Sequence, residues 1–272
     1  MKIPVAIMSG LQLLLAVFGV AGCGGNHPEG VPDALRPLRV ASASDLAFAF
    51  EDLKVLHFEQ HSREVDIILG STGLLARQIQ QGAPFDIFFA ANISFVDDLI
   101  AAGAGRADTK DIYALGRIVI WSRKDRKGVT PTQLADLLSP EIGAIAIANP
   151  DHAPYGLAAK QALIASGLWE KLEPRIVYGE NVNQAFQFAR SGNADIGIIA
   201  LSLGIAAEGG DWTLVDEDLH EPIVQAMVVT QISDDPDGAI AFLQTVQSVP
   251  GRAIMRKYGF LLPGEFRLPE PE

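Results

Sequence analysis

The chain has 272 residues, of which 49% are hydrophobic, and this length predicts one large or two smaller globular domains. Its 33 acidic residues outnumber the 21 basic ones and give a net charge of −12, so we expect neither a nucleic-acid partner nor attraction to an anionic membrane surface. A single cysteine excludes a disulfide framework and a cysteine-rich metal cluster.

The first 22 residues predict a secretory signal peptide, because Lys2 precedes an apolar run that ends in small residues. Residues 20–23, Val-Ala-Gly-Cys, resemble a bacterial lipobox, in which the cysteine is lipidated. We therefore predict a periplasmic or extracytoplasmic lipoprotein that is tethered to the membrane by a lipid anchor at Cys23. Residues 23–37 are polar and rich in proline and glycine, which predicts a tether without a fold of its own.

After the tether, short apolar runs alternate with segments of helical periodicity. Strands are predicted at residues 38–41, 65–69, 86–90, 117–121, 144–148, 175–178, 195–200 and 223–230. Helices are predicted at residues 45–60, through 74–79, from 94, 132, 155 and 182, and near 237 and 251. The first helix carries Phe50, Leu53 and His57 on one face. This alternation predicts an α/β fold with mostly parallel sheets.

Motifs of enzyme catalysis are missing from the sequence. It contains no G-x-S-x-G elbow, no G-x-x-x-x-G-K-[ST] loop and no G-x-G-x-x-G fingerprint. The one cysteine is assigned to lipidation, so it is not a candidate nucleophile. We therefore expect a protein that is not an enzyme. A hydrolase stays open as an alternative, but it would need a base near Ser44 or Thr72, and neither loop contains a histidine.

Small polar residues gather at four junctions between a strand and the next helix. These junctions are residues 41–45, 70–73, 149–156 and 179–182. Taken singly, each Ser, Thr or Asn there is an ordinary helix cap, and Asn181 is placed to cap the helix that follows it. Taken together, the junctions lie at the carboxyl ends of parallel strands, where α/β sheets bind ligands. Helix N-termini offer unpaired N–H groups that favour compact oxyanions.

The charges of these junctions leave two interpretations open. Residues 41–46, 69–74, 151–156 and 179–184 contain no lysine or arginine. Such a site can bind an anion through N–H and O–H donors alone. The alternative is a hard metal site with oxygen and imidazole ligands, made by Asp45, His152, Tyr155 and Glu180.

Several segments resemble the periplasmic molybdate-binding proteins. They are residues 70–79, 82–90, 146–158 and 192–201, and the similarity runs in order from about Leu38 to Leu262. The resemblance implies the two-lobe type II periplasmic-binding-protein fold, in which two hinge crossovers join α/β lobes that close on a tetrahedral oxyanion. It places lobe one at 38–117 plus 223–268 and lobe two at 118–222. It also implies delivery of the ligand to the permease of an ABC transporter.

The resemblance assigns five residues to the oxyanion. Ser44 and Thr72 should donate their hydroxyls, and Asp45, Thr72, Tyr155 and Val182 their backbone N–H groups. Because Tyr155 would act through its backbone, Tyr155→Phe is expected to change binding little. Some relatives have an asparagine where Asp45 stands, so we expect the Asp45 carboxylate to face away from the ligand as a helix cap. Some relatives also use a tyrosine hydroxyl where this chain has Ala200.

The implied function is that of a substrate-binding lipoprotein that captures molybdate, and also tungstate, as a monomer. The ligand would be bound as an oxyanion, with no resident metal and no cofactor. The alternative is a protein of the same fold that binds another ligand, either sulfate, phosphate or a ferric or other metal cation.

Overall fold

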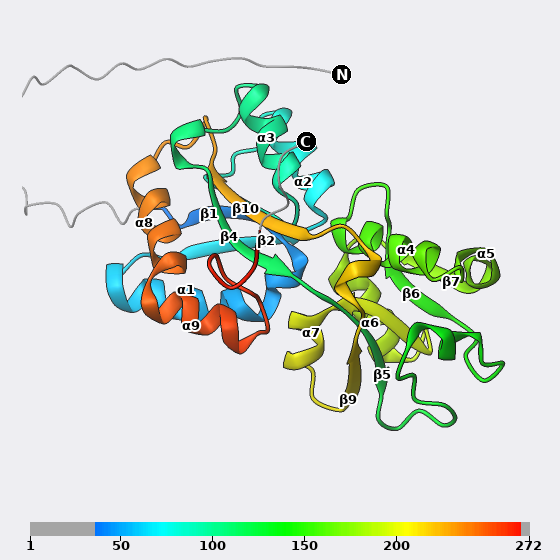
Figure 1. Ribbon diagram of the computed structural model, residues 1–272. Helices are drawn as coiled ribbons and strands as arrows, with labels where there is room; N and C mark the ends of the chain where they lie inside the picture. Colours follow the sequence, from blue (N-terminus) through cyan, green and yellow to red (C-terminus); the bar gives the residue numbers. More distant parts are fainter. Residues whose placement is uncertain (1–35, 268–272) are drawn as a thin grey trace, which may run out of the picture. The chain divides into compact units, whose positions relative to one another are not determined.

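The computed structural model describes residues 36–267 (Figure 1). The predicted signal peptide, Cys23 and nearly all of the predicted tether lie outside the described residues, so they stay predictions. The strands are β1 (Leu38–Ala43), β2 (Val65–Gly70), β3 (Ile87–Ala90), β4 (Asp111–Gly116), β5 (Ile118–Arg123), β6 (Ile145–Ala148), β7 (Ile176–Gly179), β8 (Ile196–Ala200), β9 (Gly210–Leu214) and β10 (Ile223–Val229).

Helices connect most of these strands. The α-helices are α1 (Ala47–His61), α2 (Thr72–Gln80), α3 (Ile93–Ala101), α4 (Pro154–Ala165), α5 (Trp169–Leu172), α6 (Val182–Ser191), α7 (Leu201–Ala206), α8 (Pro236–Gln247) and α9 (Val249–Lys257). Short 3-10 helices are η1 (Ser44–Leu46), η2 (Ala107–Thr109), η3 (Leu134–Leu138), η4 (Glu173–Arg175) and η5 (Glu217–Leu219). In residues 36–267, no helix is both long and apolar enough to cross a bilayer.

The strands form two five-stranded sheets. The first has the order β2-β1-β3-β10-β4 and the second the order β7-β6-β8-β5-β9. The chain passes from the first sheet to the second at Arg117, between β4 and β5, and returns between β9 and β10. Strand membership therefore supports the predicted lobes at 38–117 plus 223–268 and at 118–222, and this division stays a prediction.

The expectation of mostly parallel sheets is confirmed for strand direction, except that one strand of each sheet, β10 or β5, runs against the other four. In the first sheet β1 pairs in parallel with β2 and β3, but β10 runs antiparallel to both β3 and β4. In the second sheet β6 is parallel to β7 and β8, whereas β5 is antiparallel to β8 and β9. The antiparallel pairs all involve β5 or β10, the strands that enter a sheet directly after a crossing. They do not follow a right-handed βαβ connection within that sheet, so nothing fixes them parallel.

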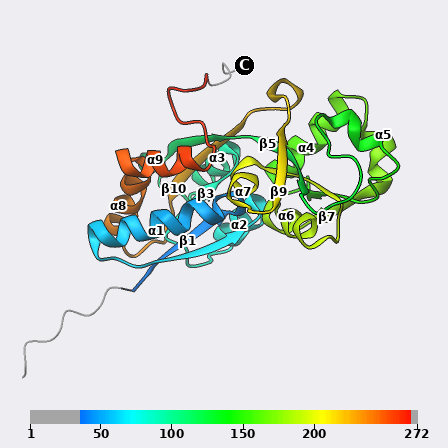
Figure 2. The ribbon, with the colours of Figure 1, turned by 90° about the horizontal axis from the view of Figure 1, so that it is seen from below.

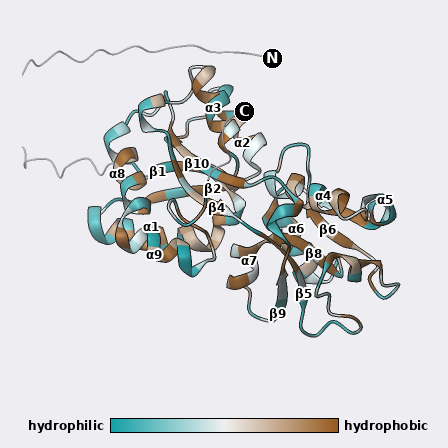
Figure 3. Ribbon diagram, viewed as in Figure 1, coloured by the Kyte–Doolittle hydropathy of each residue, from teal (hydrophilic) through white to brown (hydrophobic). Residues whose placement is uncertain are grey.

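Each face of the first sheet has its own apolar core. Ile87 and Phe89 of β3 pack toward α1, α8 and α9, which lie together in Figures 1 and 2, whereas Phe88 and Ala90 pack toward α2 and α3. This alternation is the period of two expected of a strand covered on both faces. The predicted buried face of α1 is confirmed, because Phe50, Leu53 and His57 are all fully buried. The central strands are accordingly largely apolar in Figure 3.

Some elements differ from their prediction. The helix predicted from Thr132 is the short 3-10 helix η3. Strand β9 was not predicted, because it is an edge strand with a mostly exposed surface and lacks the apolar run used to find strands. Helix α7 was also missed, since it begins immediately after β8 with no polar junction between them.

Candidate functional site

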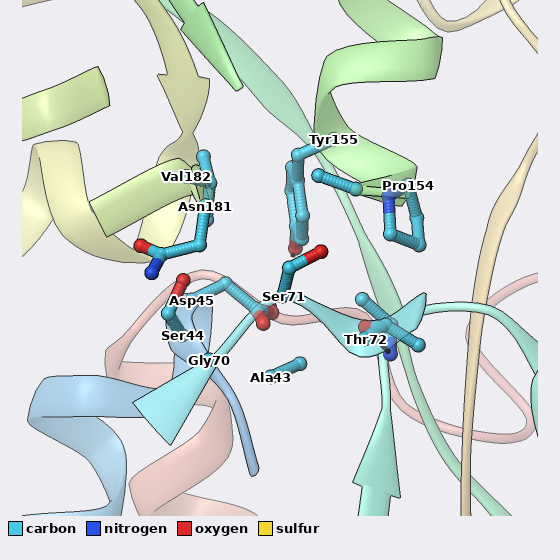
Figure 4. Close-up of a pocket in the computed structure, with 12 residues that line it drawn as sticks. Ala43, Ser44, Asp45, Gly70, Ser71, Thr72, Pro154, Tyr155, Asn181 and Val182 are labelled. Carbon is cyan, nitrogen blue, oxygen red and sulfur yellow. Dashed lines mark hydrogen bonds between the residues drawn. The ribbon is translucent and has the colours of Figure 1, made fainter. Parts of the chain in front are cut away.

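The four junctions meet at one small cavity between the two sheets. Its lining comprises Ala43, Ser44, Asp45, Gly70, Ser71, Thr72, Ala91, Ala153, Pro154, Tyr155, Asn181 and Val182. Figure 4 shows the labelled side chains around this common space. All five residues predicted to contact the oxyanion line it, and none of the lining residues is a lysine or arginine. The cavity has a volume of about 10 Å³, room for roughly one water molecule.

Helix starts supply the donors of this cavity. No side chain caps α2 or α4, and Pro154 at the start of α4 makes the N–H of Tyr155 the first that this helix offers. Asn181 does cap α6, as predicted, but it accepts from Gln184 and not from Val182. The first N–H groups of a helix have no acceptor within the helix. The N–H groups of Thr72, Tyr155 and Val182 therefore stand at the cavity without a helical partner.

The hydroxyls of Ser44 and Thr72 are oriented by backbone groups. Thr72 Oγ1 accepts the N–H of Ala91 at 3.1 Å, and Ser44 Oγ accepts the N–H of Asn183 at 3.3 Å. Each oxygen is thus held in place as an acceptor, and its own proton stays available to an acceptor in the cavity. This arrangement is suited to an anion and leaves both hydroxyls as donors.

The Ser71 hydroxyl differs from those of Ser44 and Thr72, because it is hydrogen-bonded to the opposite lobe. Ser71 Oγ donates to the carbonyl of His152 at 2.7 Å and lies 2.7 Å from His152 Nδ1. Since the only hydroxyl proton goes to the carbonyl, Nδ1 must carry the hydrogen and donate to Ser71. The N–H of Gly73 also donates to the His152 carbonyl, at 2.9 Å. This cluster closes the cavity at one side by joining α2 to the loop before α4.

The Asp45 carboxylate is buried and does not cap a helix, so that expectation is wrong. Neither η1 nor α1 has a side-chain cap. Instead Asp45 Oδ2 accepts the Tyr155 hydroxyl at 2.9 Å and the Gln225 amide at 2.7 Å. The physical reason is that two buried donors satisfy a carboxylate better than one partly solvated helix start. Ser202 Oγ of α7 donates to the Asp45 carbonyl at 2.7 Å, which adds another bond between the lobes.

In the described part of the chain, the Asp45 carboxyl group is buried without a cationic side chain beside it, and this environment determines at which pH it is charged. Desolvation raises the pKa of Asp45 from 3.8 to about 6, and the hydrogen bonds from Gln225, Tyr155 and its own backbone partly oppose the rise. Burial, and then the nearby carboxylate, raise the pKa of Tyr155 well above its usual value. The tyrosine therefore stays protonated and acts as a donor. Its hydroxyl thus has a structural partner in Asp45, beside the backbone N–H that the resemblance assigns to the oxyanion.

The metal alternative finds little support in this geometry. His152 is bonded to Ser71, whereas Asp45 and Tyr155 are bonded to each other. The fourth candidate, Glu180, does not line the cavity. Within residues 36–267, no three His, Cys, Asp or Glu side chains are grouped as a metal site would require.

Comparison with known proteins shows the family. The model of a family described as bacterial extracellular solute-binding protein matches residues 38–261. The chain belongs to this family. It is 31% identical to the molybdate-binding protein ModA of Rhodobacter capsulatus over 96% of this chain and 98% of the relative. It is 34% identical to ModA of Azotobacter vinelandii over 82% of this chain and 89% of that protein.

The solved structures agree with this family assignment. The periplasmic molybdate-binding protein of Azotobacter vinelandii matches with a TM-score of 0.77 and 32% identity, over 83% of this chain and 99% of that one. The predicted two-lobe α/β fold and the resemblance to periplasmic molybdate-binding proteins are thereby confirmed. The sulfate-binding protein SubI of Mycobacterium tuberculosis, at 15% identity and a TM-score of 0.68, shares the fold alone.

Sequence reasoning missed one polar residue next to the site of this solute-binding protein. Gln225 is fully buried and donates to both Asp45 and Tyr155, yet it lies in an apolar run that predicts only a strand. A single buried glutamine inside IVQAMVV was the available signal, since a buried amide requires partners.

Proposed function

We propose that this solute-binding protein captures molybdate, and also tungstate, in the cavity between its lobes and delivers it to an ABC permease. One observation carries the proposal. Three helix starts and two hydroxyls, from both lobes, direct unpaired donors into a single small cavity without lysine or arginine. Donors without counter-ions favour a compact anion with many acceptor oxygens. The two ModA relatives, at 31% and 34% identity, carry molybdate in their names.

Selectivity among tetrahedral dianions would come from size. Molybdate and sulfate have the same charge and the same number of oxygens, but Mo–O bonds are longer than S–O bonds. The donors belong to helix starts packed on buried strands, so they cannot move inward without straining the core beneath them. Sulfate would leave several hydrogen bonds long. We therefore expect molybdate and tungstate to bind far more tightly than sulfate.

Phosphate would meet a different obstacle. As the monohydrogen form near neutral pH it needs an acceptor for its proton, and the one carboxylate at the cavity within residues 36–267 is that of Asp45. Its Oδ2 accepts from Tyr155 and Gln225, whereas its buried Oδ1 has no hydrogen-bond partner in the described structure. A cation would meet the N–H groups of helix starts, which repel positive charge. A cation is thus a poorer partner than a dianion without a proton, and phosphate would bind tightly only if Asp45 Oδ1 accepted its proton.

Placement of the protein follows from the N-terminal prediction. A lipid at Cys23 would hold the binding lobes outside the cytoplasm, near the membrane that contains the permease, and the monomer would be the working form. The lipobox pattern supports this placement. Treatment of growing cells with an inhibitor of lipoprotein signal peptidase would leave the precursor uncleaved if it is correct, and Cys23→Ala would abolish lipid incorporation.

Calorimetric titration with molybdate, tungstate, sulfate, phosphate and ferric ion tests the ligand. The expected result is one molybdate or tungstate per chain, with far weaker sulfate and phosphate binding and no ferric binding. Sulfate binding as tight as molybdate binding would contradict the size argument. Ferric binding without molybdate binding would replace the proposal with the metal alternative.

A further inference from the structure

Gln225 connects the hinge to the site. It lies on β10, a few residues after the chain returns from the second sheet, and its side chain is completely buried. Its pairing with β4 is irregular at this point. Gln225 pairs with Ala114 and Ala226 with Ile112, so Tyr113 is left over as a bulge. Bulges re-aim side chains and bend a strand locally. The irregularity lies beside Gln225, the residue of this crossing strand whose buried amide contacts both lobes.

The amide completes a triangle of hydrogen bonds. Gln225 Nε2 lies 2.7 Å from Asp45 Oδ2 and 2.8 Å from Tyr155 Oη, and the tyrosine hydroxyl donates to the same carboxylate oxygen at 2.9 Å. The three groups come from η1, α4 and β10. The backbone N–H groups of Asp45 and Tyr155 are two of the donors assigned to the oxyanion. The triangle thus ties together one donor of each lobe and a strand of the hinge.

The second crossing strand packs against the same triangle. A Cβ atom at Gly116, the last residue of β4, would lie 2.2 Å from Tyr155 Oη and 2.8 Å from Gln225 Nε2. Only a glycine leaves room for the tyrosine to reach the hinge there. Both crossing strands consequently contact the point where Asp45 and Tyr155 meet.

Separation of the lobes would break this triangle. Asp45 and Tyr155 belong to different lobes, so opening removes the tyrosine donor from a carboxylate whose environment, in the described structure, contains no charged partner. In the closed form the bonds to Oδ2 offset part of the cost of burying this carboxylate, whose Oδ1 is buried without a partner among the described residues. The two bonds of Tyr155, which cross between the lobes, therefore favour the closed form specifically.

We propose that Gln225 is a positioning residue that locks the lobes closed, by holding the Asp45 carboxylate and the Tyr155 hydroxyl together at the hinge. The lock rests on the proposed function, because its purpose is to retain a bound oxyanion. Gln225 does not line the cavity, so it acts through the other two residues. Replacing Gln225 should therefore raise the rate of ligand dissociation and leave the rate of ligand association with the open form unchanged.

Stopped-flow binding of molybdate to Gln225→Leu tests this inference. The dissociation rate is expected to rise about tenfold or more above wild type, which corresponds to the loss of one hydrogen bond to a charged group. The association rate should stay within about twofold of the wild-type rate. Gln247→Leu is the matched control, because Gln247 Nε2 also donates to a carboxylate, that of Asp111, but at the surface. The control should release molybdate at the wild-type rate.

Gln225→Glu is a second variant that keeps the shape of the side chain. With both carboxyls ionised it should release molybdate fast, and a proton shared with Asp45 should restore slow release as the pH falls from about 8 to about 5. The other titratable groups facing the pair are the hydroxyls of Tyr155 and Tyr113, and burial raises the pKa of each well above its usual value. The wild type is measured in parallel at each pH.

Two results would overturn the inference alone. One is wild-type binding of molybdate with unchanged dissociation from Gln225→Leu, and the other is a Gln225→Glu variant whose release rate follows the wild type at every pH. A wild-type protein that binds no molybdate would overturn the proposed function and this inference with it.

Discussion

Removal of a single oxygen atom by Tyr155→Phe tests how the two lobes are held together. The hydroxyl donates to Asp45 Oδ2 at 2.9 Å, and both side chains are almost completely buried. A hydrogen bond to a charged group contributes about 1.5–3 kcal/mol, and each 1.4 kcal/mol changes a dissociation constant about tenfold. Because the bond joins the lobes, the loss should appear as molybdate affinity lower by about 10- to 100-fold.

The loss of molybdate affinity in Tyr155→Phe should depend on pH. The pKa of Asp45 is about 6, so below that pH the carboxyl is protonated and the lost donor matters less. The expected loss is therefore larger at about pH 8 than at about pH 5. The assay is calorimetric titration at both pH values.

Tyr178→Phe provides a control for this assay. Tyr178 lies on the edge strand β7 and is 45% exposed, so its variant should bind as the wild type does. Wild-type affinity in Tyr155→Phe at about pH 8 would refute the role assigned to the hydroxyl.

Three further predictions concern the ligand donors, the contact between lobes and the buried carboxyl. Thr72→Ala removes a hydroxyl donor and should weaken molybdate binding by about 1–3 kcal/mol in a titration, whereas Thr213→Ala, remote from the cavity, should not. Gly73→Ala places a Cβ 2.9 Å from the carbonyl oxygen of His152, so it should weaken binding by holding the lobes apart, and an unchanged affinity would contradict closure at this contact. The raised pKa of Asp45 means that the folded state holds this proton more tightly than the unfolded chain. The contribution of the Asp45 proton to the free energy of unfolding is fully present below about pH 4. It is lost as the pH rises through about 6, and the whole loss is about 3 kcal/mol. Denaturant unfolding of Asp45→Asn should lack that fall relative to the wild type, and parallel pH profiles would show that Asp45 is not the titrating group.

Much of the site was predictable because its donors are backbone groups at strand-to-helix junctions. Apolar runs located the strands, and the polar residues after them located the four junctions. The resemblance then assigned Ser44, Thr72, Tyr155 and Val182 to the ligand, and all four line one cavity. Periodicity and junction chemistry are local properties, so a sequence reveals them.

The partners of Asp45 were not predictable in the same way. They lie 110 and 180 residues away along the chain, at Tyr155 and Gln225. The reversed directions of β5 and β10 were also missed, because a crossing strand has the same apolar composition whichever way it runs in its sheet. The link between Ser71 and His152 likewise depends on closure of the lobes, which no local pattern records.

A crystal structure of the protein with molybdate tests the central claim most directly, because anomalous scattering from molybdenum locates the ion. The account predicts the anion in the cavity, within hydrogen-bond distance of Ser44 Oγ, Thr72 Oγ1 and the backbone N–H groups of Tyr155 and Val182. Asp45 should remain bonded to Tyr155 and Gln225. An anion held elsewhere on the chain, or a cavity occupied by a cation coordinated by the Asp45 and Tyr155 side chains, would contradict it.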